Sequence, residues 1–316
     1  MLKTSKEGTQ KKMISVKQIA EFSGHQNPIF TVDNSQKPHI FFTAGNDKGV
    51  VEWSMKTMTL VKVLMPVKTS VYCLHSPKNQ SFIAVGERSG SVSIFNFEQQ
   101  EVVEIINHHQ LPVFDIKSVL SKQELLLSSE DGSVSVWSLV DFKFIYKFAV
   151  SGDTVRVIAI SADEKYVAFG CKDAVIRVYS LEDYSLHIEL KDHTMPITSL
   201  QFSPDGRYLL SGSRDAQLKV WSYGDFTLFK SIPAHLFTIY DIKFHPTLNI
   251  FATASRDKSI KIWDADNLNL YKTISREKGF PMHRLSVNKI AWSTYNEALI
   301  SISDDKLIMA WDIKFE

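Results

Sequence analysis

The chain has 316 residues, of which 44% are hydrophobic and 22% are charged, and its formal net charge is +1. This composition is typical of a globular protein with a sizeable core. A net charge so close to zero argues against a protein dedicated to binding nucleic acid or an anionic membrane surface.

The chain carries only two cysteines, Cys73 and Cys171, and each lies inside a separate apolar run. This placement favours reduced core thiols over a disulfide or a redox pair. No apolar run approaches the roughly 20 residues that a transmembrane helix needs. Residues 1–12 are polar and basic and lack the apolar centre of a secretory signal. We therefore expect an intracellular, cytoplasmic protein.

In chain order, the first predicted element is a flexible tail over residues 1–13, followed by the apolar run Ile14–Phe22. From there to the end, runs rich in Val, Ile, Phe, Tyr and Leu alternate with turns rich in Asp, Gly, Asn, Pro and Ser, which predicts short strands. No segment has an apolar period of 3.6 residues, so we expect an all-β protein. The runs do not alternate cleanly between apolar and polar residues, which is typical of sheets covered on both faces.

An aromatic residue recurs every 42 residues, with a last interval of 48, at Trp53, Phe95, Trp137, Tyr179, Trp221, Trp263 and Trp311. A fixed period of roughly 40 residues indicates a repeat architecture. Seven units of about four strands, each needing cover on both faces, favour a ring of sheets, that is, a β-propeller. Because the units follow one another without a linker, we predict a single domain over residues 14–316.

Three further residue types recur at fixed distances before these aromatic residues. Counting back 28, 10 and 6 residues gives positions at which His, Ser or Thr, and Asp recur with Trp. All four types occur together in the first, fifth, sixth and seventh units, as His25, Thr43, Asp47 and Trp53, as His193, Ser211, Asp215 and Trp221, as His235, Thr253, Asp257 and Trp263, and as His283, Ser301, Asp305 and Trp311.

The other three units depart from this pattern. The third unit has His109 and Asp131 and lacks only the hydroxyl, because Leu127 stands at that position. The fourth keeps Asp173 and Tyr179. The second keeps none of the four, and its Val67, Val85 and Ser89 suggest that this unit relies on apolar packing instead.

These recurring residues resemble the WD-repeat β-propeller family over residues 14–316. The closing Trp-Asp pair of that family stands at Trp263-Asp264 and Trp311-Asp312, and its turn stands at Ser203-Pro204-Asp205-Gly206. The resemblance implies a seven-bladed β-propeller of four-stranded antiparallel blades. It further implies hydrogen bonds within a blade between Asp and His, between His and Ser or Thr, and between Ser or Thr and Trp. A protein-interaction scaffold is the function that the resemblance implies.

Only four residues follow Asp312, so the last unit lacks a fourth strand, while the run Ile14–Phe22 belongs to no unit. The resemblance implies that this N-terminal strand completes the last blade, which removes an exposed sheet edge.

A recurring His, Ser and Asp invites a hydrolase interpretation, but four copies in one register favour a structural role. The histidines outside the register show no metal-ligand spacing, and Cys73 with His75 lacks further ligands. There is no phosphate-binding or dinucleotide-binding glycine motif. We therefore predict no catalytic residues, no metal and no cofactor. Asp115, Lys117, Asp241 and Lys243 occupy equivalent inner-strand positions and either line the central channel or pair with neighbours, and we favour pairing.

One face of such a ring carries the loop around the His and the turn before the Asp, and the resemblance implies that partners bind there. Basic and apolar residues at these places form our candidate partner-binding set: Lys172, Arg214, Arg256, Met195, Phe237, Phe280, Met282 and Arg284. This mixed patch would suit a protein or peptide with acidic residues, bound by a propeller that is monomeric on its own. Two alternatives are a subunit of a nucleic-acid-associated complex that contacts phosphates through the basic arc, and an enzyme that uses the central channel.

Overall fold

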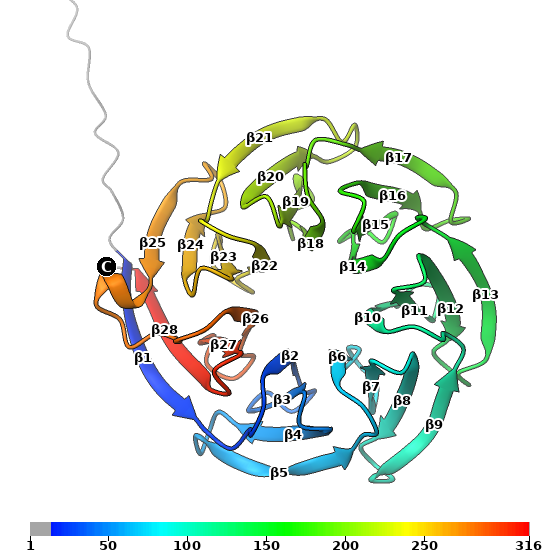
Figure 1. Cartoon of the computed structure of the whole chain (residues 1–316), viewed down its shortest axis with the longest axis horizontal. Helices are drawn as coiled ribbons and strands as arrows, with labels where there is room; N and C mark the ends of the chain where they lie inside the picture. Colours follow the sequence, from blue (N-terminus) through cyan, green and yellow to red (C-terminus); the bar gives the residue numbers. More distant parts are fainter. Residues whose placement is uncertain (1–13, 316) are drawn as a thin grey trace, which may run out of the picture.

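The computed structural model describes residues 14–315, which form seven four-stranded antiparallel sheets arranged as the blades of a ring (Figure 1). The predicted tail over residues 1–13 lies outside the described residues. The predicted all-β class and the seven-bladed β-propeller are confirmed. In each blade the innermost strand lines the central channel and the outermost strand lies on the circumference (Figure 1).

The four strands of a blade follow one another from the centre of the ring outwards. Blade one has β2 (Ile29–Asn34), β3 (Ile40–Gly45), β4 (Gly49–Ser54) and β5 (Thr59–Pro66). Blade two has β6 (Val71–His75), β7 (Phe82–Glu87), β8 (Ser91–Asn96) and β9 (Glu101–Asn107). Blade three has β10 (Val113–Val119), β11 (Glu124–Ser129), β12 (Ser133–Ser138) and β13 (Phe144–Ala149). Blade four has β14 (Val155–Ile160), β15 (Tyr166–Cys171), β16 (Ile176–Ser180) and β17 (Leu186–Leu190).

Blade five has β18 (Ile197–Phe202), β19 (Tyr208–Ser213), β20 (Gln217–Ser222) and β21 (Leu228–Pro233). Blade six has β22 (Ile239–Phe244), β23 (Ile250–Ser255), β24 (Ile260–Asp264) and β25 (Leu270–Ile274). A one-turn 3-10 helix, η1 (Arg276–Lys278), lies in the longer connection that follows. Blade seven has β26 (Val287–Trp292), β27 (Leu299–Ser303) and β28 (Ile308–Phe315), with β1 (Ile14–Phe22) as its outermost strand.

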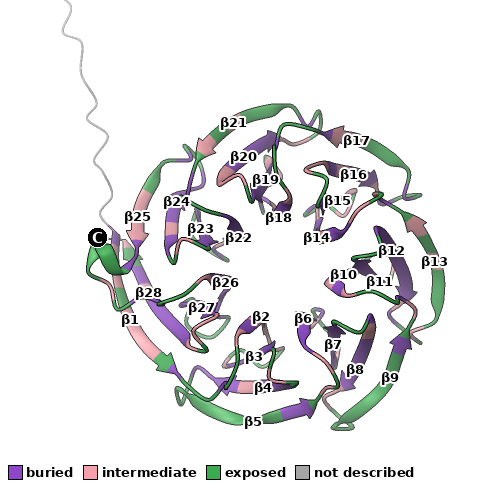
Figure 2. Cartoon of the chain, in the orientation of Figure 1, coloured by how far each residue is buried: buried purple, intermediate pink, exposed green. Residues whose placement is uncertain are grey.

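Burial explains why the apolar runs are continuous. The second strand of each blade is buried on both faces, since neighbouring blades pack against it, whereas the outermost strands β5 and β9 are largely exposed (Figure 2). Apolar clusters form between neighbouring blades, so that burial of hydrophobic surface holds the ring together.

The N-terminal strand closes the ring, as the sequence predicts. β1 pairs antiparallel with β28, from Ile14 opposite Phe315 to Phe22 opposite Ile308. The last blade thus combines both ends of the described chain and leaves no gap in the ring (Figure 1). Shielding the edge of β28 in this way removes a row of unpaired backbone groups that would otherwise invite aggregation.

Each inner strand carries a register shift close to its start, for example between Ile29 and Thr31 in β2 and between Val113 and Asp115 in β10. An extra residue of this kind is a β-bulge, which redirects a side chain. The bulge residue is half-buried in all seven blades, and those of blades three to six line the cavity of the central channel. None of the helices described in residues 14–315 is long and apolar enough to span a membrane.

Candidate protein-interaction face

Strand direction decides which connections share a face of the ring. Because the strands alternate in direction, the loop from an outermost strand to the next inner strand opens on the same side as the turn between the two middle strands. The register His lies in the first connection and the register Asp in the second. We call this side the loop face, and hydrogen bonds between the two connections organise it.

Blade six shows the hydrogen-bonded set most fully. His235 Nδ1 lies 2.9 Å from Asp257 Oδ2, and His235 Nε2 lies 2.7 Å from Thr253 Oγ1. Trp263 Nε1 donates to the same Thr253 Oγ1 at 2.9 Å. The structure brings the four residue types together in the same way in blades one, five and seven.

The protonation states follow from the environment of these groups. Burial lowers the pKa of His235 against the opposing effect of Asp257, so the imidazole is neutral near pH 7. Burial by itself raises the pKa of Asp257, but hydrogen bonds from His235 and Ser259 outweigh it and hold that pKa well below its usual range. With a neutral imidazole, Trp263 donates to Thr253, Thr253 donates to His235 Nε2, and His235 Nδ1–H donates to the Asp257 carboxylate. Each polar atom in this buried chain is then satisfied.

Blade three completes the same chain with a hydroxyl from another strand. Ser135, in β12, lies 2.9 Å from His109 Nε2 and accepts from Trp137 Nε1 at 2.9 Å, while His109 Nδ1 lies 2.8 Å from Asp131. The register position of this blade lacks the hydroxyl, as the sequence indicates, but the blade as a whole does not. Leu127 stands where the other blades have Ser or Thr, and Ser135 on the neighbouring strand supplies the missing oxygen.

Blade two is also not purely apolar, which corrects the prediction made from Val67, Val85 and Ser89. The buried Glu87 carboxylate accepts from the backbone N–H and the hydroxyl of Thr69, both at 3.1 Å. Ser93 donates to its other oxygen at 3.4 Å. A different carboxylate therefore links the loop and the turn in this blade.

In blade four an arginine replaces the histidine. Arg177 pairs with Asp173 at 2.8 Å and with Glu189 at 2.9 Å, and Ser151 donates to Asp173 at 2.8 Å.

The register Asp also fixes the backbone of the loop. Asp257 Oδ2 accepts the N–H of Leu236 at 3.0 Å, and Asp215 Oδ2 accepts the N–H of Thr194 at 3.1 Å. The next residue of each loop is held as well. Ser255 donates to the carbonyl of Phe237 at 3.3 Å, and Ser213 donates to the carbonyl of Met195 at 2.9 Å. The side chains that project from these loops are thus held on a rigid backbone.

The side chains so presented are large and apolar. We define the apolar ridge as Met195, Leu236, Phe237 and Leu285, which belong to three consecutive loops leading into blades five, six and seven. Their exposed fractions are 43%, 81%, 57% and 47%. Scattered exposed apolar residues are ordinary on a protein surface, whereas these four share three adjacent loops of one face.

Arginines flank the ridge. The backbone N–H of Arg256 donates to the Thr238 carbonyl at 3.0 Å and that of Arg214 donates to the Pro196 carbonyl at 2.9 Å, so each exposed arginine lies beside a ridge loop. Arg284 is exposed next to Leu285. Lys172 stands apart in blade four, where it pairs with Asp153 at 3.1 Å.

Two predicted contact residues do not belong to an exposed patch. Met282 is only 2% exposed and packs into the core cluster between blades six and seven. Phe280 is half-buried and lies edge-on against Trp311, with ring centroids 6.4 Å apart. The chain folds back after η1 and turns both side chains inward, so their assignment to the partner surface is corrected. Sequence reasoning missed Leu236 and Leu285 in turn, although Leu285 shares the repeat position of Met195 and Phe237.

An arc of aromatic rings borders the channel entrance on the loop face. It is formed by bulge residues of the inner strands, where Phe30 packs on Tyr72 with ring centroids 5.8 Å apart and Tyr72 stacks on Phe114 at 5.2 Å. The guanidinium carbon of Arg156 lies 4.9 Å from the centroid of Phe114. These positions share one register in the repeat, a signal that sequence analysis could have used.

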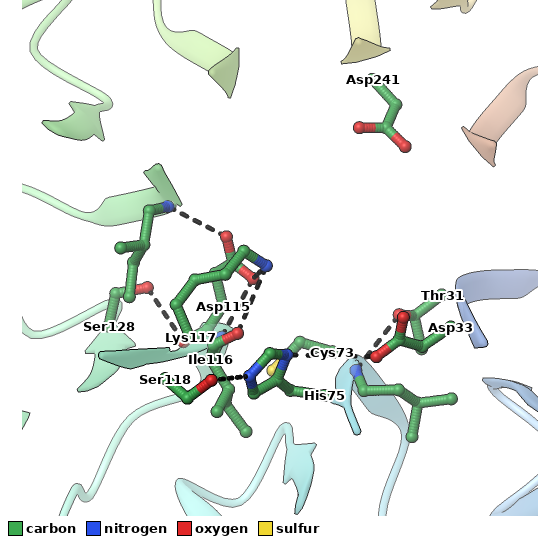
Figure 3. A network of polar contacts seen from close by, with 12 residues as sticks. Thr31, Asp33, Cys73, His75, Asp115, Ile116, Lys117, Ser118, Ser128 and Asp241 are labelled. Carbon is green, nitrogen blue, oxygen red and sulfur yellow. Dashed lines mark hydrogen bonds and ion pairs between the residues drawn. The ribbon is translucent and has the colours of Figure 1, made fainter. Parts of the chain in front are cut away.

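The central channel holds a cavity of about 480 Å³ with charged walls. Lys117 pairs with Asp115 at 3.0 Å (Figure 3), and Lys243 lies 3.8 Å from Asp241. These residues thus both line the channel and pair with each other. Asp115 also accepts the N–H of Ile158 in blade four at 2.9 Å, which fastens neighbouring blades.

His75 lines the channel cavity, whereas Cys73 is fully buried in the neighbouring core cluster, and neither group is suited to catalysis. Burial raises the pKa of the Cys73 thiol to about 12, so it is protonated near pH 7. Burial, then the charge of Lys117, lowers the pKa of His75 to about 3, and its Nε2 lies 2.9 Å from Ser118 Oγ (Figure 3). Within residues 14–315, no three His, Cys, Asp or Glu side chains are placed to hold a metal ion.

The ring of seven blades, with its hydrogen-bonded sets, defines a β-propeller built from sequence repeats. The sequence model described as WD domain, G-beta repeat matches residues 16–54, 184–222 and 226–264. Each matched segment combines the outermost strand of one blade with the three inner strands of the next, as β21 with β22, β23 and β24. Three segments of the protein thus match the WD repeat, and the whole ring has the fold of a seven-bladed β-propeller.

Curated relatives share this repeat over part of their length. COMPASS component SWD3 of Saccharomyces cerevisiae is 26% identical over 138 residues, which are 41% of this chain and 44% of that protein. E3 ubiquitin-protein ligase COP1 of Arabidopsis thaliana is 22% identical over 48% of this chain and 23% of its own length. Peptidyl-prolyl cis-trans isomerase 9 of Schizosaccharomyces pombe is 27% identical over 39% of this chain and 21% of its own length. The chain thus spans less than half the length of each of these relatives.

Proposed function

We propose that this propeller is a non-catalytic scaffold that docks a protein or peptide partner on its loop face. The observation that carries the proposal is the apolar ridge, because four large apolar side chains stand exposed on adjacent loops, and hydrogen bonds from Leu236 N–H to Asp257 and from Ser255 to the Phe237 carbonyl hold the backbone beneath them. Holding them in place before binding reduces the entropy that a partner must overcome. Arg214, Arg256 and Arg284 form a cationic rim around this apolar centre, an arrangement typical of protein interfaces.

The relatives agree with this proposal in general terms. SWD3 is by its name a component of a complex, and COP1 is by its name a protein ligase, so both names describe proteins that act on or with other proteins. The partner in our proposal carries acidic residues, because arginines surround the ridge. We place the protein in the cytoplasm and propose that it is monomeric until it meets its partner.

The alternatives have less support. A nucleic-acid-associated role needs a continuous basic surface, whereas Lys172 is neutralised by Asp153 and the ridge is apolar. An enzyme in the channel needs an ionisable nucleophile or a metal. The Cys73 thiol is protonated and buried in the core, and the His75 imidazole on the channel wall is only weakly basic, so neither supports a nucleophile.

The test is selective capture of one protein. We would purify the chain from source-cell lysate and compare the wild type with a Leu236→Ser, Phe237→Ser variant. The matched control is Phe229→Ser, because Phe229 lies on the outermost strand β21 and is 56% exposed, close to the value for Phe237.

We expect a protein that the wild type and Phe229→Ser capture and that the ridge variant loses. Equal capture by all three would contradict docking on the loop face. Capture that nuclease treatment abolishes would favour the nucleic-acid alternative instead.

A further inference from the structure

A cleft opens on the loop face between blades six and seven, beside the apolar ridge. Its volume is about 320 Å³, and Leu236 of the ridge forms part of its wall. On the other side lie residues Ser275 to Lys278, which belong to the long connection from β25 to β26. That connection runs over residues 275–286, whereas the corresponding one from β21 to β22 covers only residues 234–238. The extra residues build a wall for this cleft.

Among the charged residues that line the cleft, cations outnumber carboxylates. Lys258, Lys261, Arg276 and Lys278 contribute positive charge, against the carboxylates of Asp257 and Glu277. Asp257 already accepts from His235, from the N–H of Leu236 and from the N–H and hydroxyl of Ser259. Among residues 14–315, none of the four cations has a carboxylate ion-pair partner. The cleft therefore carries an uncompensated positive potential.

Lys261 is the most constrained of these cations. Its Nζ donates to the backbone carbonyl of Ala234 at 2.6 Å, so its only direct partner among the described residues is neutral. Burial lowers the pKa of Lys261, since the ammonium is partly removed from water, and the charge of Asp257 offsets this only in part. A partly desolvated ammonium is stabilised by an anion that comes within hydrogen-bonding distance.

We propose that this cleft binds an anionic side chain, a carboxylate or a phosphate group, from the peptide segment that docks on the apolar ridge. The inference rests on the proposed function and specifies its partner. Leu236 belongs both to the ridge and to the cleft wall, so one short segment reaches both with an apolar and an acidic residue in close succession. Charge complementarity selects the occupant, because a neutral side chain would leave Lys261 without a counter-ion.

Blade five supplies a matched control for Lys261. Lys219 occupies the same position of the repeat, and its Nζ donates to the carbonyl of Asp192, also at 2.6 Å. The connection beside it lacks the extra residues that wall the cleft. A change at Lys219 therefore removes the same internal hydrogen bond but no part of the binding site.

The experiment uses three pools of fluorescein-labelled twelve-residue peptides and the full chain. Two central positions are both phosphoserine, both Glu or both Gln, and the flanking positions are mixtures of Leu, Phe, Gly and Ser. Affinity is measured by fluorescence anisotropy for the wild type, Lys261→Met and Lys219→Met. Methionine keeps the apolar stem of the lysine in place. A further variant, Arg276→Gln with Lys278→Gln, changes only exposed residues, so that it gives a result even if Lys261→Met fails to fold.

We expect the wild type to bind at least one acidic pool about tenfold more tightly than the Gln pool. Lys261→Met and the Arg276→Gln, Lys278→Gln variant should lose that preference, while Lys219→Met should keep it. Tighter binding of phosphoserine than of Glu would identify a phosphate, and equal binding a carboxylate. Absence of any acidic preference, or an equal loss in Lys219→Met, would overturn the inference. If capture of a partner still depends on Phe237 in that case, the docking proposal stands and only the proposal that the cationic cleft binds an anionic side chain is refuted.

Discussion

At the scale of single residues, the register Asp connects the core of a blade to its surface. In blade six the Asp257 carboxylate ends the chain of hydrogen bonds that begins at the buried Trp263, and it also holds the N–H of Leu236. The residue that stabilises the blade is therefore the one that positions the apolar ridge. Structure and proposed function depend on the same atoms.

This double role makes Asp257→Ala destabilising. The change leaves His235 Nδ1 and the Leu236 N–H without their acceptor, and we expect the free energy of unfolding to fall by about 1–3 kcal/mol. Urea denaturation measures the difference. Asp192→Ala removes an exposed carboxylate and should stay within about 0.5 kcal/mol of the wild type. An unchanged midpoint for Asp257→Ala would show that the hydrogen-bonded set contributes nothing to stability.

The same sets predict how stability depends on pH. Burial lowers the pKa values of His25, His109 and His235 in the folded protein, so the unfolded chain takes up protons first as the pH falls below about 6.5. Stability should therefore be complete above that pH and decline below it. Burial by itself raises the pKa of Asp215, but hydrogen bonds led by that from His193 lower it to about 2, so its contribution is lost between about pH 4 and pH 2.

Urea unfolding measured in steps from pH 8 to pH 3 tests this dependence. We expect a free energy of unfolding that is nearly constant above about pH 7 and falls steadily below about pH 6.5. A stability maximum near pH 5 would show that the histidines are stabilised in their charged form, contrary to the burial argument.

At the scale of elements, the repeat period made most of the architecture predictable. A period of 42 residues fixes the number of blades and the strand order, because every copy must bury the same apolar positions. The closing strand β1 was predictable as the apolar run that no repeat used. The role of Ser135 was not predictable. Its hydroxyl takes the place of the one missing at Leu127, and only the pairing of β11 with β12 brings the two positions together.

The closing strand has a direct test. Deleting residues 1–22 should expose the edge of β28 and the apolar side chains that β1 covers, so we expect aggregation or loss of a cooperative melt. Deleting residues 2–13 alone is the control, and that variant should melt as the full chain does. A monomeric 1–22 deletion with an unchanged melting temperature would contradict the role assigned to β1.

At the scale of the whole molecule, the ring places equivalent positions of the repeat side by side on one face. Strand alternation gathers seven loops on one side, so residues at the same repeat position become neighbours there. Met195 and Phe237 were predictable for this reason, and Leu285 follows the same rule. The rule does not apply to Phe280 and Met282. They lie in the connection whose extra residues interrupt the period, and the fold of η1 turns their side chains inward.

The central claim is that a partner docks on the apolar ridge. The most direct test is the dissociation constant of the captured partner for the wild type, Phe237→Ala and Phe229→Ala, measured by calorimetry. Apolar anchors at the centre of an interface commonly contribute about 2 kcal/mol or more, so we expect Phe237→Ala to weaken binding at least about tenfold. Phe229→Ala should leave the affinity unchanged within about twofold. Equal effects of the two changes, or a larger effect of Phe229→Ala, would contradict docking on the loop face.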